Sequence, residues 1–261
     1  MTEIVTLLDA AHAAVSADPE NEALRLRFFE RLADGEMVLL LEREVVGDRL
    51  EPKVFKLEDG PVVLVFDREE RLAEFSGGIA PYAALPGRVI AGLLKGQGIG
   101  MGVNLGVAPS SMLLPPEAMD WLAETLADGP EEVEALPQEF VAPSVPEAVI
   151  AALDAKLARA GGLAVAALLT GVVYRDGRRG HLLALLDTVE GAEGALARAM
   201  REALVFSGVE AGELDVVFLR AGDPAAQAMA RVGLRFDLPE PEAPVAPAAP
   251  GMDPSRPPKL R

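Results

Sequence analysis

The sequence predicts an α/β (α+β) protein with two mixed-sheet domains, each with packed helices, and a flexible Pro/Ala-rich C-terminal tail. Its 261 residues correspond to about two domains of roughly 150 residues each. Half of the residues are apolar and a quarter are charged, as in globular proteins. Stretches with helical and with strand periodicity alternate along the chain, which is typical of sheets covered by helices.

Shifts in composition divide the chain into four parts. We assign residues 1–128 to a first domain and residues 145–238 to a second. Residues 129–144 hold prolines among acidic residues and are predicted to form a linker. Residues 239–261 contain eight prolines and few large apolar side chains, too few to order a segment by burial.

In the first domain, helical spacing predicts a helix over residues 3–15, capped by Thr2, and a second helix from Asp18-Pro19 to Gly35. Residues 62–66 are continuously apolar and rich in β-branched side chains, which predicts a central strand buried on both faces. The other expected elements are strands over 37–41 and 53–57, a short helix from Asp67 to Phe75, a helix over 86–95, a glycine-dense strand within 96–106, and a helix after Pro116.

In the second domain, Ser144 and Glu147 have the spacing of a capping box, which predicts a helix to about Ala160. The expected elements that follow are a hairpin of strands over 163–174 and 181–186, a helix over 189–205, a strand over 214–219, and a helix from Asp223-Pro224. Phe236 is expected to end the ordered pattern. The domain is therefore predicted as α-β-β-α-β-α.

Residue types and charge exclude several classes of protein. The chain has no cysteine and two histidines, so we expect no disulfide, no Cys-ligated metal and no three-His site. A formal charge of −17 argues against nucleic acid or an anionic membrane as the partner. The N-terminus lacks a signal-peptide pattern and no apolar run has the length of a membrane span. We therefore expect a cytoplasmic protein with no cofactor.

The glycine-dense segment 96–106 is the main candidate for a ligand site. Backbone N–H groups exposed around Gly98, Gly100, Asn104 and Ser110 would suit a carboxylate. Neither a Walker loop nor a dinucleotide fingerprint matches, because the lysine precedes the glycines and no helix follows them directly. The structural alternative is a strand whose alternating glycines allow another segment to approach closely.

Catalytic arrangements are weak in this sequence. Ser110 lies near the glycines, but His12 falls on the first helix and His181 on a hairpin strand, so a Ser–His pair is not expected. The acidic run 131–134 and the basic hairpin tip 175–179 are explained as solvated charge. We predict no catalytic residue and no metal ligand.

The pattern resembles the SseB-like family (enhanced serine sensitivity protein) over roughly residues 18–238. Its N-terminal domain is suggested by Gly60–Phe66 with the acid-rich short helix after it, Tyr82, Leu85–Gly87, Gly96–Asn104 and Leu114–Glu117. Its C-terminal domain is suggested by Pro143, Pro146, His181–Leu183 and Leu214–Val217. The chain has Asn104-Leu105-Gly106 where the family pattern leads us to expect Asn-Pro-Gly. The resemblance implies a bacterial cytosolic protein without established catalytic residues.

Three functions follow as hypotheses. The first is a non-catalytic module that binds an unidentified protein partner, with a homo-oligomer left open and the tail as a tether. The alternative is a protein that binds a small, amino-acid-like metabolite at segment 96–106. The third is an enzyme that uses carboxylates.

Overall fold

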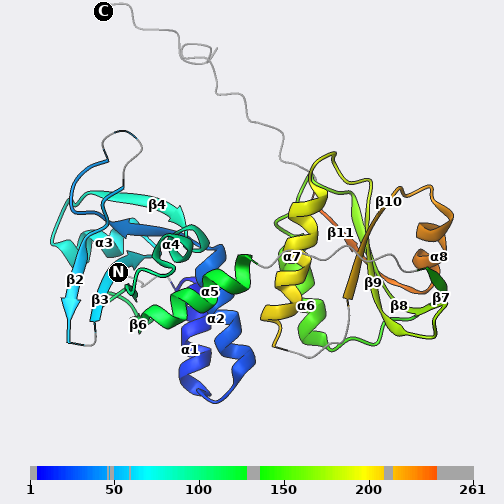
Figure 1. Cartoon of the computed structure of the whole chain (residues 1–261), viewed down its shortest axis with the longest axis horizontal. Coiled ribbons are helices and arrows are strands. Elements are labelled where there is room, and N and C mark those ends of the chain that lie inside the picture. Colours follow the sequence, from blue (N-terminus) through cyan, green and yellow to red (C-terminus); the bar gives the residue numbers. More distant parts are fainter. Residues whose placement is uncertain are drawn as a thin grey trace, which may run out of the picture.

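The structure, a computed structural model, describes residues 5–45, 47, 50–58, 60–127, 136–208 and 214–239. It confirms the α/β class, with two mixed sheets that are each packed against helices (Figure 1). The acidic run 131–134 and the tail after Pro239 lie outside the described residues.

The first sheet has the strand order β4-β1-β3-β5-β6 in the described part of the chain. Strand β2 pairs with the start of β3, on the same edge of β3 as β1. The β3–β5 pair is parallel and the other pairs are antiparallel. The elements of this half are α1 (Leu7–Ala17), α2 (Glu22–Asp34), β1 (Glu36–Leu40), β2 (Val54–Leu57), β3 (Gly60–Phe66), α3 (Glu69–Ser76), β4 (Tyr82–Pro86), α4 (Gly87–Leu94), β5 (Gly100–Val103), β6 (Met112–Leu114) and α5 (Pro116–Ala127).

The two faces of this sheet are covered differently. One face packs against α1, α2, α4 and α5, and residues such as Leu39, Val63 and Met101 bury there. The opposite face carries Val38, Leu64 and Phe66, and α3 packs on it through Leu72. As predicted, β3 is buried on both faces because its alternate side chains serve both clusters.

The second sheet has the strand order β10-β9-β8-β11 in the described residues, and β7 also pairs with β8. Helices α6 and α7 cover one face and α8 covers the other. The elements of this half are β7 (Pro137–Val141), α6 (Glu147–Leu157), β8 (Ala166–Tyr174), β9 (Arg179–Leu186), α7 (Glu193–Phe206), β10 (Leu214–Leu219), α8 (Pro224–Val232) and β11 (Leu234–Asp237).

Four strands of the described residues lie where the sequence predicted none, and two of them, β4 and β6, pair with β1 and β5 at the edges of the first sheet. Strand β7 falls inside the predicted linker 129–144, and Phe140 pairs opposite Val172 of β8. Strand β11 begins one residue after Gly233 and pairs antiparallel with β8. Strands β7 and β11 are short edge segments whose order comes from pairing with distant β8, so local pattern does not reveal them.

Helix starts also differ from the prediction because other residues form the caps. Helix α1 begins after Thr6, whose hydroxyl accepts the N–H of Asp9 while the Asp9 carboxylate accepts the N–H of Thr6. Helix α2 begins after Asn21 rather than at Asp18. The predicted Ser144 box is wrong, because α6 begins after Pro146 without a side-chain cap.

Candidate functional site

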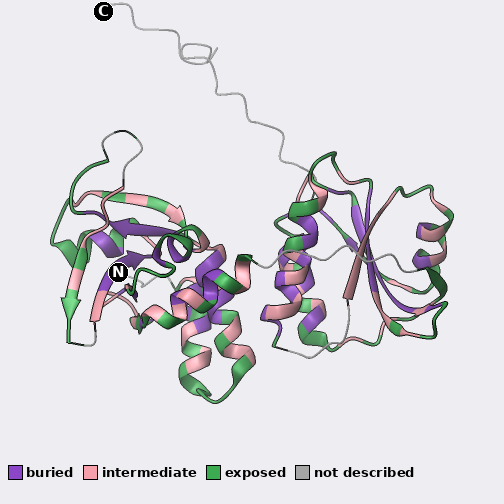
Figure 2. Cartoon of the chain, in the orientation of Figure 1, coloured by how far each residue is buried: buried purple, intermediate pink, exposed green. Residues whose placement is uncertain are grey.

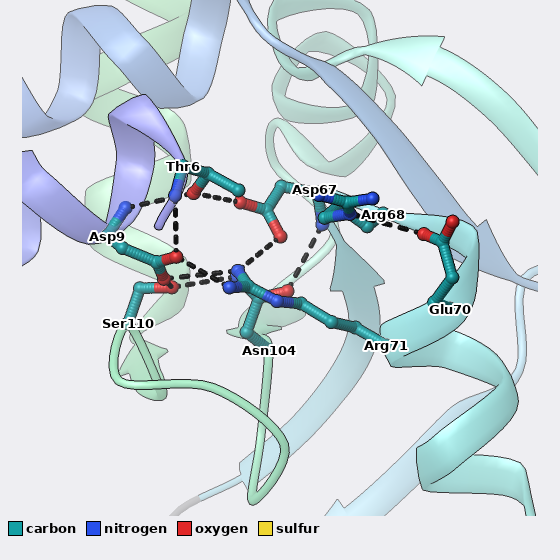
Figure 3. A network of polar contacts seen from close by, with 8 residues as sticks. All are labelled: Thr6, Asp9, Asp67, Arg68, Glu70, Arg71, Asn104 and Ser110. Atoms are coloured by element: carbon teal, nitrogen blue, oxygen red, sulfur yellow. Dashed lines mark hydrogen bonds and ion pairs between the residues drawn. The ribbon is translucent and has the colours of Figure 1, made fainter. Parts of the chain in front are cut away.

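A buried polar network joins α1, α3 and the loop after β5 (Figure 3). At its centre, the Arg71 guanidinium donates two hydrogen bonds to Asp9 and one of 2.7 Å to Asp67. Asp9 is 2% exposed, and Arg71 is buried as well. Asp67 lies two residues before the first residue of α3, where the sequence predicted the helix to start, and it accepts the Thr6 hydroxyl at 2.6 Å. The network thus ties the first helix to the sheet.

The structure brings together two of the four predicted ligand-binding residues. Asn104 Nδ2 donates to Ser110 Oγ at 2.8 Å, and the Ser110 hydroxyl donates to Asp9. Asn104 Oδ1 accepts the backbone N–H of Asp67 at 3.1 Å. Asn104 has a φ of 49°, a left-handed conformation that asparagine tolerates better than most residues. Asn104 and Ser110 are fully buried, and their polar groups are engaged within the fold.

The predicted glycines serve close packing. A Cβ on Gly100 would lie 2.4 Å from the carbonyl oxygen of Leu114, and one on Gly102 would lie 2.7 Å from side-chain atoms of Leu64 and Leu105. Gly98 has a φ of +64° and lies before β5, so the expected glycine alternation covers only Gly100 and Gly102. These contacts match the structural alternative for the segment.

The electrostatics of the network suit a structural ion pair. Burial raises the pKa of the Asp9 carboxyl, but hydrogen bonds from Arg71, Ser110 and Thr6 outweigh it and hold the pKa far below its ordinary value. A carboxylate with such a low pKa is a poor proton acceptor near neutral pH. Neither histidine is among the hydrogen-bond partners of Ser110.

Sequence reasoning singled out Asn104 and Ser110 but missed Asp9 and Arg71. The spacing Thr6-x-x-Asp9 resembles a capping box and was an available signal for Asp9. The spacing of Asp67 and Arg71 is a local signal for their ion pair, but nothing local indicates the pairing of Arg71 with Asp9, which is 62 positions away in the chain.

A second charged cluster lies where the two halves of the protein meet. Lys156 Nζ on α6 lies 2.7 Å from Asp34 and 3.1 Å from Glu202. Arg88 of α4 contacts both of these carboxylates, at 2.9 Å for Glu202. Two further members are Glu30, 3.6 Å from Lys156, and Arg159, 2.9 Å from Asp34. We call these six residues, three acids and three bases, the joint cluster.

The pKa values of the three carboxyl groups in the joint cluster are shifted in different directions. Burial raises the pKa of Glu30, and its attraction to Lys156 only partly offsets this. For Asp34 and Glu202, burial also acts upward, but hydrogen bonds from Lys156 and Arg88 outweigh it and lower each pKa. Glu30 is therefore the carboxyl group of the cluster whose charged form is disfavoured by the fold.

Apolar contacts also hold the joint. Phe206, the last residue of α7, is buried in the core of the first half and lies 6.5 Å from Trp121 between ring centroids. Gly208 approaches α2 so closely that a Cβ would lie 2.7 Å from the Cα of Ala23. The two halves are thus packed against each other.

A cleft of about 220 Å³ opens beside this contact. Helix α2 lines one side, α6 the other, and the end of α7 contributes the rest. Its lining includes Arg27, Glu30 and Arg31 of α2, Ala148, Ala151, Ala152 and Ala155 of α6, and Phe206.

A third feature is the outer surface around α3, far from the second half of the molecule (Figure 1). Leu57, Phe75, Ile79 and Tyr82 are exposed there, and Ile79 is fully exposed at 107%. Strand β2 is drawn mostly as exposed in Figure 2. Register places Tyr82 opposite Leu40, and the Phe75 ring lies 5.3 Å from Phe66, so both flank the α3 side of the sheet. We call these four residues the α3 patch.

Carboxylates surround the α3 patch. Glu58, Glu69, Glu70 and Glu74 are all exposed near it in sequence, and Glu69 hydrogen-bonds Tyr82. Lys56 and Arg68 are the nearby bases, and Arg68 pairs with Glu70 at 3.2 Å. The patch is therefore apolar with an acidic rim.

Among the described residues, no three or more His, Asp or Glu side chains are arranged so that they could hold a metal ion. No helix in the described ranges has the length and apolarity needed to cross a membrane. Comparison with protein-family models, curated proteins and solved structures finds no match to this chain.

Proposed function

We propose that the protein is a non-catalytic, cytoplasmic binding protein of SseB-like type that holds another protein at the α3 patch. The observation that carries the proposal is the exposure of Leu57, Phe75, Ile79 and Tyr82 on one side of the first sheet. Large exposed apolar side chains gathered beside polar ones are typical of sites for other proteins.

The charge around the patch defines the partner's chemistry. Because exposed glutamates such as Glu70 and Glu74 lie beside apolar side chains, the complementary segment carries apolar residues next to lysine or arginine. Such a segment buries its apolar residues on Ile79 and Phe75 while its cations meet the acidic rim. A predicted tail of 23 residues, 239–261, then acts as a tether.

The test is site-specific photo-crosslinking with the full-length protein in its native cells. A photoreactive residue at Ile79 is expected to capture one protein in high yield. The matched control is Val165, which is exposed at 57% but lies in the second half of the chain. No adduct from position 79, or the same adducts from positions 79 and 165, would contradict the proposal.

Binding of the purified partner then tests the chemistry. Ile79→Ser is expected to weaken binding about tenfold, while Val165→Ser leaves it unchanged. Added salt is expected to weaken binding of the basic segment, because exposed charges are screened. A salt-independent affinity would show that the acidic rim does not take part.

A further inference from the structure

We propose that the cleft between α2 and α6 binds a small aliphatic carboxylate, held by Arg27 and Arg31 against the alanine wall of α6. This site is separate from the α3 patch and does not depend on the function proposed above. It also lies away from segment 96–106, whose polar groups are used within the fold.

The first support is a pair of arginines that line the cleft and form no side-chain ion pair with a described residue. Arg27 and Arg31 are one turn apart on α2 and both line the cleft. Within the described residues, neither guanidinium group has a hydrogen bond or an ion pair within 4 Å, although Arg31 attracts Glu30 at longer range. Like charges at this spacing destabilise a helix. In a chain with a formal charge of −17, two unpaired arginines facing one cleft suit an anion.

The second support is the opposite wall. Ala148, Ala151, Ala152 and Ala155 line it from α6, so this wall carries no charge or hydrogen-bonding side chain. Phe206 adds an aromatic surface at the end of the cleft. An anion with a short hydrocarbon chain satisfies both walls, whereas inorganic phosphate satisfies only the arginines.

The size of the cleft agrees with this class of ligand. Its volume of about 220 Å³ compares with about 30 Å³ for one water molecule in the liquid. A carboxylate with a few methylene groups therefore fits, and a nucleotide does not.

Glu30 also lines the cleft, where its ionised carboxylate would oppose binding of an anion. Burial raises the pKa of Glu30, which weakens its negative charge, and Lys156 lies 3.6 Å from it. Because Lys156 is already paired with Asp34 and Glu202, Arg27 and Arg31 supply the positive charge available to a ligand. A carboxylate at the mouth of the cleft meets the arginines before it meets Glu30, because Arg27 is exposed and Glu30 is buried.

Isothermal titration of the full chain with acetate, butyrate and hexanoate at constant ionic strength tests the proposal. Affinity is expected to rise along the series, by about fourfold for each buried methylene. Inorganic phosphate is the comparison ligand and is expected to bind more weakly than hexanoate. No binding of hexanoate at millimolar concentrations, or tighter binding of phosphate, would overturn the proposal.

Three variants separate this site from general charge effects. Arg27→Gln with Arg31→Gln is expected to weaken hexanoate binding at least about tenfold. The control Arg25→Gln, on the same helix but paired with Glu22, is expected to leave binding unchanged. Ala152→Leu is expected to weaken hexanoate more than acetate, because it fills the apolar wall. Equal losses in the Arg25 control and the double variant would overturn the proposal, and unchanged Trp121 fluorescence verifies that each variant is folded.

Discussion

Asp9 holds α1, α3 and the loop after β5 together through one carboxylate. Asp9→Asn is expected to lower the free energy of unfolding by about 3 kcal/mol, because it leaves the buried Arg71 guanidinium with one carboxylate instead of two. Urea unfolding measures the loss. The exposed pair Arg68–Glu70 supplies the control, since Glu70→Gln removes an ion pair in water and is expected to change little.

Asp9 also makes the stability of the fold depend on pH in the acid range. The pKa of Asp9 lies below its unfolded value of 3.8, so its contribution to stability is present above that pH and is lost as the pH falls toward the lowered pKa. Wild-type stability is therefore expected to drop below pH 3.8 more steeply than that of Asp9→Asn. Parallel curves for the two proteins would disprove the link.

Glu30 is expected to behave in the opposite way. Its pKa is raised above the unfolded value of 4.5, so the folded state loses stability as the pH rises through the folded pKa. Glu30→Gln removes this loss, and Lys156 keeps its closer partners Asp34 and Glu202. The variant is expected to gain stability relative to wild type between pH 4.5 and pH 7 in urea titrations. A destabilised variant at pH 7 would show that Glu30 is a net stabilising ion-pair partner.

At the scale of elements, the close packing of strand β5 requires that Gly100 and Gly102 have no side chains. Gly100→Ala is expected to destabilise the first domain by about 2 kcal/mol or more, because the new Cβ meets a backbone oxygen 2.4 Å away. Gly92 in α4 has nothing within 4 Å of such a Cβ and is the matched control. Gly92→Ala is expected to stabilise by about 0.5–1 kcal/mol, since alanine favours the helix. Thermal unfolding of both variants measures the contrast.

Some elements follow from local sequence signals, whereas others depend on pairing with distant segments of the chain. The hairpin of β8 and β9, the strand β10 and the helix α8 lie where periodicity and turn residues predicted them, because those signals are local. Strand β7 owes its order to β8, and the site partners Ser110 and Asp9 meet only after the chain has folded. Asn104 and Ser110 were therefore predictable as unusual residues, whereas their role in a closed network was not.

At the scale of the whole molecule, the joint cluster couples the two halves. Lys156→Ala removes the cation shared by Asp34, Glu202 and Glu30, and is expected to cost about 3–5 kcal/mol. Trp121, the only tryptophan, lies 6.5 Å from Phe206 and reports the contact by fluorescence. We expect wild type to unfold in one transition and the variant in two, as measured by Trp121 fluorescence and circular dichroism together.

The position of Phe206 has a consequence for synthesis of the chain on the ribosome. The core of the first half includes this ring, yet α5 ends at Ala127, so the first half is made well before its last core residue. At about 5–20 residues per second, the gap lasts on the order of ten seconds. During that interval the nascent first half presents Trp121 without the ring that packs against it. Chaperones that recognise apolar surface thus have a defined period in which to bind.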